Sequence, residues 1–260
     1  LDYESATSHS LTISASDGTY SDTATITVKV NNLNDNEPSI ENATVAIDEN
    51  IAEGTEIYDV NDAFTTSDLD RDGEAIVYSI TSGNEAGIFV IDEATGVITI
   101  ADGKTLDYES ATSHSLTISA SDGEHSDTAT VTVNVNNLND NAPAIVDAEV
   151  TFDENIAAGS SIYNVNDSNT GSDSDRDGDV ITYSIESGNE DGIFVINTAT
   201  GEITIAAGKT LDYESKTEHQ LVVKASDGTN SDTATITVKV NNLNDNAPAI
   251  VDAEVTFDEN

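Results

Sequence analysis

One tether-like segment recurs in this chain at a fixed interval, and the interval limits what the chain can fold into. The sequence Asn-Asn-Leu-Asn-Asp-Asn begins at Asn31, Asn136 and Asn241, an interval of 105 residues both times. The second residue after each copy is a proline, and the chain has only these three prolines. This interval is too long for a solenoid repeat and fits a small whole domain. We interpret each copy as a polar tether between two domains.

Other motifs repeat in the same register, so the units align without gaps. The sequence Leu-Asp-Tyr-Glu-Ser, for example, begins at Leu1, Leu106 and Leu211. Because the chain contains no methionine, we expect it to be an excerpt from a longer protein. The predicted parts are the C-terminal part of one repeat at 1–36, complete repeats at 37–141 and 142–246, and the N-terminal part of a further repeat at 247–260.

The hydrophobic pattern within a unit predicts β-strands. Alternation of apolar and polar residues, with a few short apolar runs, is typical of strands with one buried face. Turn pairs such as Asp102-Gly103 and Asp122-Gly123 separate the segments. No stretch has helical periodicity, so the predicted fold class is all-β, as tandem seven-stranded Greek-key β-sandwiches of the immunoglobulin-like kind. The seven segments of the first complete unit are 40–47, 55–60, 75–81, 88–91, 96–100, 116–120 and 128–135.

The charge balance is extreme and excludes several classes of function. The chain has 50 Asp and Glu against 8 Lys and Arg, a formal charge of -42. Such a charge opposes compaction unless cations neutralise it, and a divalent cation gathers several carboxylates at once. The sequence offers no basic patch for nucleic acid, and no apolar run long enough for membrane insertion. Disorder is the other reading of an acidic chain, but the regular alternation argues against it.

Five motifs of the second complete unit occur in a fixed order. They are Asp153-Glu154-Asn155, Asp173-x-Asp175, Leu211-Asp212-Tyr213-Glu214, Ala225-Ser226-Asp227-Gly228, and Asn242 to Asn246 followed by Pro248. With these motifs the unit resembles cadherin repeats, specifically the bacterial cadherin-like domains of large calcium-dependent surface adhesins. This resemblance covers the whole chain and implies an extracellular rod of calcium-linked sandwiches.

The resemblance also implies which residues bind calcium, with about three ions at each complete junction. Calcium takes about six to eight oxygen ligands, so two domains and the tether share each site. At the middle junction the implied ligands are Glu49, Asp107, Glu109, Asn137, Asn139, Asp140, Asn141, Asp173, Asp175 and Asp227. The first junction has Asp2, Glu4, Asn32, Asn34, Asp35, Asn36, Asp68, Asp70 and Asp122. The last has Glu154, Asp212, Glu214, Asn242, Asn244, Asp245 and Asn246.

One departure from the family and two alternative readings bear on these sites. The family usually has Asp at the first ligating tether position, where this chain has Asn32, Asn137 and Asn242, which bring no charge. The Asp-x-Asp-x-Asp-Gly segments also match the start of an EF-hand loop, but the twelfth position is a serine in both copies. We interpret Asp72 and Asp177 as turn residues, with metal ligation as the open alternative.

The predicted function is a calcium-stiffened stalk in a repetitive bacterial surface adhesin, secreted to the cell surface and acting in biofilm adhesion. Its partners are then the neighbouring repeats of the same chain. The alternatives are a calcium-dependent binding module, for polysaccharide or for other copies of itself, and a subunit of a self-assembled filament. The four histidines are too sparse to indicate catalysis or zinc binding. We therefore predict that the protein is not an enzyme.

Overall fold

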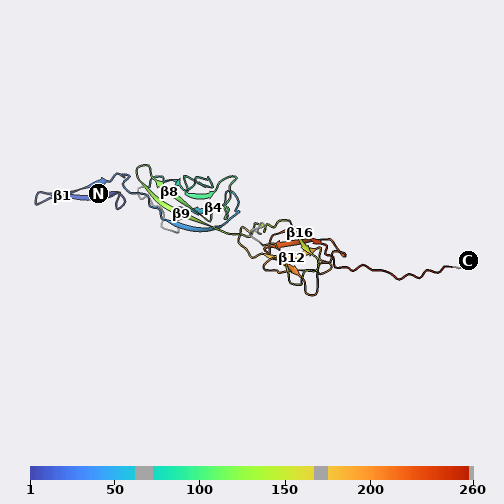
Figure 1. Ribbon diagram of the computed structural model, residues 1–260. Coiled ribbons are helices and arrows are strands. Elements are labelled where there is room, and N and C mark those ends of the chain that lie inside the picture. Colours follow the sequence, from blue (N-terminus) through green and yellow to red (C-terminus); the bar gives the residue numbers. More distant parts are fainter. Residues whose placement is uncertain (62–72, 167–174, 258–260) are drawn as a thin grey trace. The chain divides into compact units, whose positions relative to one another are not determined.

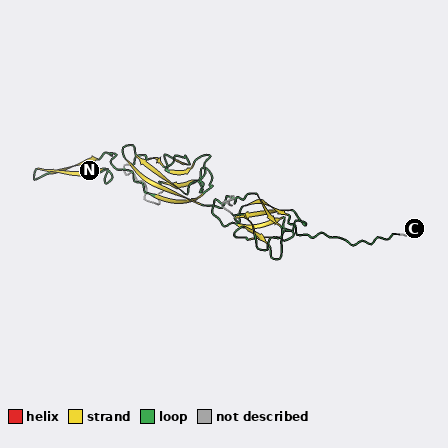
Figure 2. Cartoon of the chain, in the orientation of Figure 1, coloured by secondary structure: helices red, strands yellow, loops and turns green. Residues whose placement is uncertain are grey.

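The computed structural model describes residues 1–61, 73–166 and 175–257, and these residues form strands and loops with no helix (Figures 1 and 2). The chain divides into two compact units, Leu1–Leu138 and Asn139–Asn260. The first unit holds a hairpin and a β-sandwich, and the second holds a second β-sandwich.

Within the described residues, the first sandwich contains seven strands in two sheets. The four-stranded sheet has the order β3-β9-β8-β5 and the three-stranded sheet the order β4-β7-β6. The strand bounds are β3 Ala43–Asp48, β4 Glu56–Asp59, β5 Val77–Ser82, β6 Phe89–Ile91, β7 Val97–Ile100, β8 Ser113–Ser121 and β9 Ser126–Asn136.

The core lies between these two sheets and comes from the alternating apolar positions. Leu116, Ile118 and Val131 of the larger sheet and Ile98 of the smaller sheet are completely buried. The alternate residues of β8 and β9 are mostly threonine and serine, which are less buried. The period of two in the sequence therefore sorts side chains between core and solvent, as expected for a strand with one buried face.

The second sandwich repeats this architecture 105 residues further along the chain. Its sheets have the orders β10-β16-β15-β12 and β11-β14-β13. The bounds are β10 Ala148–Asp153, β11 Ser161–Asn164, β12 Thr182–Ser187, β13 Phe194–Ile196, β14 Glu202–Ile205, β15 Glu218–Ser226 and β16 Ser231–Asn241.

The first strand of each sandwich lies parallel to the last strand of the same domain. Ala43 is opposite Val131 in the β3–β9 ladder, and Ala148 is opposite Ile236 in the β10–β16 ladder. In each domain this pairing brings the end of the first strand beside the start of the tether. Glu49 and Glu154 follow immediately after these first strands.

The hairpin pairs β1 Ser8–Ser16 with β2 Ser21–Lys29. Most of its apolar residues are exposed, with 54% for Leu11 and 51% for Ile13. The equivalent Leu116 and Ile118 of the first sandwich are 0% exposed. The hairpin has the sequence of the last two strands of a sandwich, but within the described residues it has no facing sheet to cover it.

The structure confirms the predicted all-β fold, with two seven-stranded sandwiches. Each predicted segment of the first complete unit contains or overlaps one strand, and the ends shift by a few residues. The repeat boundaries predicted at 37–141 and 142–246 stay a prediction.

Candidate metal-binding site

The turn after β3 places Glu49 at the end of the first sandwich. The backbone N–H of Glu49 donates to the carbonyl of Asn136 at 3.2 Å, and that of Asn50 donates to the carbonyl of Leu106 at 3.0 Å. Asn50 has a φ of 58°, in the left-handed region that asparagine tolerates better than most residues. The Asp-Glu-Asn motif therefore encodes a sharp turn with Glu49 at its start.

The Glu49 side chain is only 2% exposed, and both of its oxygens accept backbone hydrogen bonds. Oε2 accepts the N–H of Tyr108 at 2.8 Å, and Oε1 accepts the N–H of Leu138 at 2.8 Å. Hydrogen bonds to an ionised carboxylate are stronger than those between neutral groups. Glu49 therefore fastens the first residues of the tether to the domain that precedes it.

Asp107 is oriented by its own turn. Its Oδ1 accepts the N–H of Ser110 at 3.1 Å, and its Oδ2 accepts the Ser110 hydroxyl at 2.8 Å. The Ser110 hydroxyl is the largest influence that lowers the pKa of Asp107 below its usual value. The carboxylate is therefore held ionised, which is the state that ligates a hard cation.

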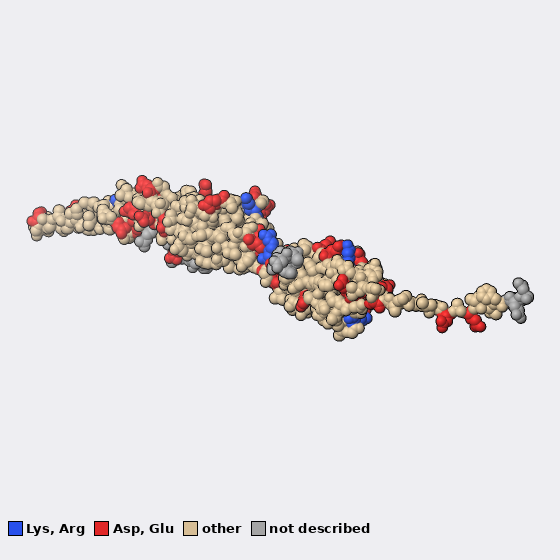
Figure 3. All heavy atoms as spheres, in the orientation of Figure 1, with Lys and Arg blue, Asp and Glu red and all other residues tan. Residues whose placement is uncertain are grey.

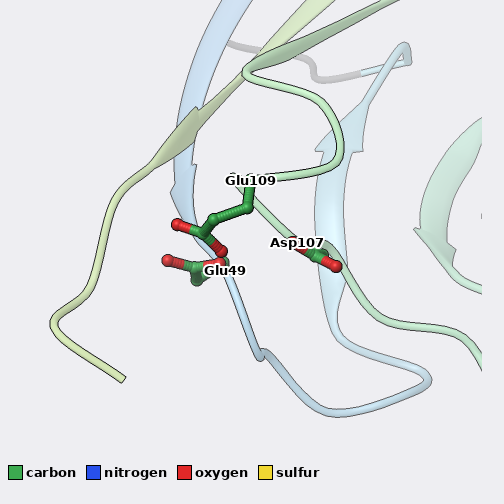
Figure 4. Close-up of side chains that lie close together, drawn as sticks. All are labelled: Glu49, Asp107 and Glu109. Carbon is green, nitrogen blue, oxygen red and sulfur yellow. The ribbon is translucent and has the colours of Figure 1, made fainter. Parts of the chain in front are cut away.

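Glu49, Asp107 and Glu109 form a trio of carboxylates, and Figure 4 shows them gathered beside the end of β3. One ligand oxygen from each lies within 4.8 Å of the others. Three negative charges this close repel one another. A cation bound among them attracts all three and offsets that repulsion.

The second sandwich builds the same trio from Glu154, Asp212 and Glu214, again within 4.8 Å. Glu154 is 3% exposed. Its Oε2 accepts the N–H of Tyr213 at 3.0 Å, and its Oε1 accepts the N–H of Leu243 at 2.7 Å. The arrangement is thus a property of the repeat, because two domains form it independently.

The opposite end of the second sandwich carries Asp227. Its Oδ1 accepts the N–H groups of Thr229 at 2.7 Å and Asn230 at 2.6 Å. Its Oδ2 is buried and accepts no hydrogen bond from any residue that the structure describes. Asp122 occupies the same place in the first sandwich, and its pKa is lowered chiefly by the N–H of His125. One oxygen of Asp227 thus orders the turn, and the other remains for a cation.

Asp175 belongs to an acidic loop of the same unit. Its ligand oxygen lies within 4.8 Å of those of Asp177 and Asp179. Its Oδ2 is buried and accepts no hydrogen bond from residues 175–257 or the other described segments. The predicted ligands Asp68, Asp70 and Asp173 lie outside the described residues, as does Asp72.

The tether residues Asn139, Asp140 and Asn141 are bound to the second unit. The Asn230 side chain donates to the side-chain oxygen of Asn139 at 3.2 Å. The Asp177 carboxylate accepts the N–H of Asp140 at 2.9 Å and that of Asn141 at 2.7 Å. The predicted middle site thus has Glu49, Asp107, Glu109 and Asn137 in the first unit, and Asn139, Asp140, Asn141, Asp175 and Asp227 in the second.

The residues predicted for the first junction gather in two places. Asp2, Glu4, Asp35 and Asn36 line one hollow of about 660 Å³ beside the hairpin. Asn34 instead lies near His125, with 3.4 Å between Asn34 Oδ1 and His125 Nδ1. Asn32 has a buried side-chain oxygen.

The last tether is bound to the domain that precedes it. Asp245 accepts a hydrogen bond from the Asn155 side chain at 2.6 Å. Asn246 donates to Asp245 at 2.9 Å. Asn242 and Asn244 are exposed.

The donor set fits calcium. It consists of carboxylate and amide oxygens, and the chain has no cysteine. The buried Oδ2 atoms of Asp175 and Asp227 are the observation that tests the fit, because a buried carboxylate oxygen is costly without a partner. On the face that Figure 3 shows, acidic side chains far outnumber basic ones.

Sequence reasoning missed two features of these ends. It favoured a turn role for Asp177, with metal ligation as the open alternative, and did not consider Asp179, although both lie in the acidic cluster with Asp175. The signal was the run of acids at every second position from Asp173 to Asp179. It also did not predict that Glu49 and Glu154 accept backbone hydrogen bonds, because those partners are far away in sequence.

Tandem β-sandwiches with acidic residues at both ends define a class of modular, metal-binding repeat protein. The cadherin domain model matches residues 43–136 and again residues 148–241. The chain therefore belongs to the cadherin family and contains two tandem cadherin domains.

Proteins similar to this chain include animal cadherins and protocadherins. Human protocadherin Fat 1 is 38% identical over 238 residues, which cover 87% of this chain and 5% of that protein. Mouse cadherin EGF LAG seven-pass G-type receptor 2 is 34% identical over 275 residues, which cover 98% of this chain and 9% of that protein. The chain thus spans less than a tenth of the length of these relatives. They give no support to the predicted bacterial origin.

Solved structures show the same fold. The protocadherin gammaB7 EC3-6 cis-dimer structure matches with a TM-score of 0.72 at 24% identity, over 92% of this chain and 61% of that one. Mouse protocadherin-24 EC1-3 matches with a TM-score of 0.69 at 25% identity, over 93% of this chain and 82% of that one.

The family confirms several predictions in their general form. Cadherin domains bind calcium, and the acidic clusters of this chain are places where a metal can bind. They are extracellular or cell-surface domains of adhesion proteins, which are not enzymes. Among the described residues, no helix has the length and apolar character of a membrane span.

Proposed function

We propose that the two domains are calcium-stiffened spacers in the extracellular part of an adhesion protein. The observation that carries the proposal is the repeated carboxylate trio, Glu49 with Asp107 and Glu109, and Glu154 with Asp212 and Glu214. Each trio lies beside the start of a tether, since its glutamate accepts the N–H of Leu138 or Leu243. Calcium bound there would tie the tether to the domain before it.

The middle junction would hold about three ions, as the resemblance to cadherin repeats implies. The trio of the first domain would supply the anionic ligands on one side, and Asp173, Asp175 and Asp227 would supply them on the other. The tether would contribute Asn137, Asn139, Asp140 and Asn141. Asn137 brings an uncharged oxygen to a position where the family usually has aspartate. We therefore expect at least one of the ions to bind weakly, with a dissociation constant of about 10⁻⁴ to 10⁻³ M.

Calorimetric titration of the full chain with calcium tests this proposal. We expect saturable binding that is lost in Asp107→Asn together with Asp212→Asn, because these substitutions remove one carboxylate from each trio. Magnesium is the matched control, because it requires a tighter octahedral geometry and gives up its water reluctantly. Absence of calcium binding at millimolar concentration would overturn the proposal.

Association between copies of the chain is a second candidate function, and an internal sequence identity favours it. Residues 21–31, which include β2, have the same sequence as residues 231–241, which form β16. Residues 246–260 have the same sequence as residues 141–155, which include β10, the parallel partner of β16. The segment 253–257 of one copy therefore has the sequence needed to pair with β2 of another copy.

Sedimentation velocity tests this association. We expect larger species at high protein concentration, and a shift to the monomer when residues 247–260 are deleted. An unchanged distribution after the deletion would contradict strand pairing between copies. Polysaccharide binding and the bacterial setting remain predictions from the sequence alone.

A further inference from the structure

Each three-stranded sheet ends in a short edge strand with an apolar sequence. β6 lies at one end of the order β4-β7-β6, and β13 lies at one end of the order β11-β14-β13. Both strands have the sequence Phe-Val-Ile, and the central residue is exposed, with 50% for Val90 and 51% for Val195. An exposed apolar edge is a template on which a strand of another chain can pair. The chain carries two such edges with identical sequence.

One asparagine in each domain occupies the open side of this edge. The Asn84 side chain donates from Nδ2 to the carbonyl of Phe89 at 2.7 Å, and its Oδ1 accepts the N–H of Phe89 at 3.1 Å. Asn189 makes the same two bonds with Phe194, at 2.8 and 3.0 Å. Both asparagines are half-buried. A single side-chain amide thus forms the pair of hydrogen bonds that one residue of a neighbouring strand would form.

The direction of the backbone groups shows that Asn84 lies on the outer side of β6. The carbonyl of Ile88 accepts the N–H of Ala101 at 2.8 Å, so Ile88 faces the chain that continues β7. Successive residues of an edge strand face their partner and solvent in turn. The N–H and carbonyl groups of Phe89 and Ile91 therefore point outward. Asn84 uses both groups of Phe89, which are half of those that β6 presents to a new strand.

The turn before β6 holds Asn84 in this position. The N–H of Gly87 donates to the carbonyl of Asn84 at 2.9 Å, and Lys104 Nζ donates to the carbonyl of Ala86 at 3.0 Å. The second domain repeats both contacts, at 3.0 and 2.7 Å. Contacts within each domain therefore place the amide against the edge in advance.

We propose that Asn84 and Asn189 close the β6 and β13 edges against strands of a second copy of this chain. Each side chain takes the place of one residue of an incoming strand, so a copy has to displace it before pairing. The incoming strand is the same Phe-Val-Ile segment, which can pair with itself in the antiparallel direction. This inference goes beyond the proposed spacer function. It is independent of calcium binding and of pairing between residues 253–257 and β2.

The chemistry of the contact suits asparagine. Its NH₂ group donates and its oxygen accepts, so one side chain satisfies both the carbonyl and the N–H of the phenylalanine. Aspartate keeps the acceptor but cannot donate, and its charge at the edge disfavours pairing with another strand. Alanine offers neither bond nor charge. Substitution by these two residues therefore separates the loss of a hydrogen bond from the opening of the edge.

Sedimentation velocity on the full chain, with a chelator present, tests the inference. We expect Asn84→Ala combined with Asn189→Ala to form larger species, in an amount that rises with protein concentration. Asn84→Asp combined with Asn189→Asp should keep the wild-type distribution. Asn197→Ala should keep it too, and is the matched control because the Asn197 side chain accepts two N–H bonds in the turn after β13. The gain in the alanine variant should persist when residues 247–260 are deleted, which separates it from pairing with β2.

Amide hydrogen exchange in the wild-type chain supplies a second measurement, which does not depend on how well the variants fold. The amides of Phe89 and Phe194 should exchange about tenfold or more slowly than those of Ile91 and Ile196, which point to the same side of the edge. Equal rates would show that the asparagines leave the edge open and would overturn the inference. An unchanged sedimentation distribution in a folded alanine variant would also overturn it. Equal association of the alanine and aspartate variants would do the same, because lost stability rather than an open edge would then be the cause.

Discussion

At the scale of single residues, Glu49 and Glu154 combine a structural role and a candidate metal-binding role. Each is nearly buried and accepts two backbone hydrogen bonds, and each also belongs to a carboxylate trio. A buried charge is costly unless hydrogen bonds or an opposite charge compensate it. The backbone bonds compensate it in the absence of metal, so these glutamates stabilise the fold before any ion binds.

Glu154→Gln should therefore destabilise the second domain even when a chelator is present. The amide keeps one acceptor oxygen and directs an NH₂ group at the other N–H donor. We expect a loss of about 1.5 to 3 kcal/mol in the free energy of unfolding, the usual worth of a hydrogen bond to a charged group. Urea denaturation with chelator measures it.

Glu186→Gln is the matched control, since Glu186 is exposed and lies on the same domain. It should change stability by no more than about 0.5 kcal/mol. If Glu154→Gln lowered stability only in the presence of calcium, the glutamate would be a metal ligand without the structural role.

His219 should make the second domain sensitive to mild acid. It is 2% exposed, and its ring meets the Phe194 ring edge-on, with 5.3 Å between centroids. Burial is the largest influence that lowers its pKa below 6.5, followed by the charge of Lys216, whereas Asp191 acts in the opposite direction. Between the folded and unfolded pKa values only the unfolded chain binds the proton, so acidification favours unfolding.

The stability contributed by a neutral His219 is thus complete above pH 6.5 and declines as the pH falls below that value. Urea midpoints between pH 8 and about 5, with chelator present, should fall on the acidic side. His219→Phe should flatten this part of the profile. Burial also lowers the pKa of His114 in the first domain. A slope unchanged in a variant that replaces both histidines would refute this assignment.

The sequence indicated candidate residues at the domain ends, but it did not indicate all of their hydrogen-bond partners. Asp107, Asp212 and Asp227 lie in short motifs, and they accept hydrogen bonds from residues within three positions. These motifs, through the resemblance to cadherin repeats, were enough to propose them as metal ligands. The bonds of Glu49 to Leu138 and of Asp177 to Asn141 join residues far apart in sequence. Only the fold brings such partners together.

The same distinction holds at the scale of strands. Alternation predicts that β8 and β9 are strands with one buried face, because that signal is carried within each segment. The parallel ladder between β3 and β9 was not predicted, since it joins segments that are separated by most of a domain. Pairing of this kind depends on the closure of the whole sandwich.

Gly83 lies directly after β5, where the β5–β8 register shifts between Ile80 and Ser82. It has a φ of 84°, and a Cβ there would overlap the backbone carbonyl of Ser115 on β8. Gly83→Ala should therefore destabilise the first domain by more than about 2 kcal/mol, since a left-handed alanine and a backbone clash both contribute. Urea denaturation measures the loss.

Gly87→Ala is the matched control. Gly87 also has a positive φ, of 63°, but a Cβ there would meet no atom within 4 Å. Its loss should be about 1 to 2 kcal/mol, the cost of the left-handed backbone alone. Equal losses at the two positions would show that the overlap with Ser115 is relieved cheaply.

At the scale of the whole molecule, the balance of 50 acidic against 8 basic residues makes cations part of the stability of the chain. Surface acids far from one another are screened by ordinary salt. The trios differ, because their oxygens lie within 4.8 Å of one another and one glutamate of each trio, Glu49 or Glu154, is buried. Simple screening therefore cannot replace direct ligation at the domain ends.

Removal of calcium should lower both the thermal stability and the stiffness of the chain. Calcium at about a hundred times its dissociation constant stabilises a folded protein by about 2.7 kcal/mol per site. We thus expect chelation to lower Tm, and to make the particle more flexible or more compact in small-angle X-ray scattering. Raising sodium chloride to about 0.5 M in the chelated sample should restore neither property, since it screens charges without ligating them. Scattering curves that coincide with and without calcium would contradict the spacer role. Recovery of Tm and stiffness by salt alone would show that general screening, rather than bound calcium, holds the domains in place.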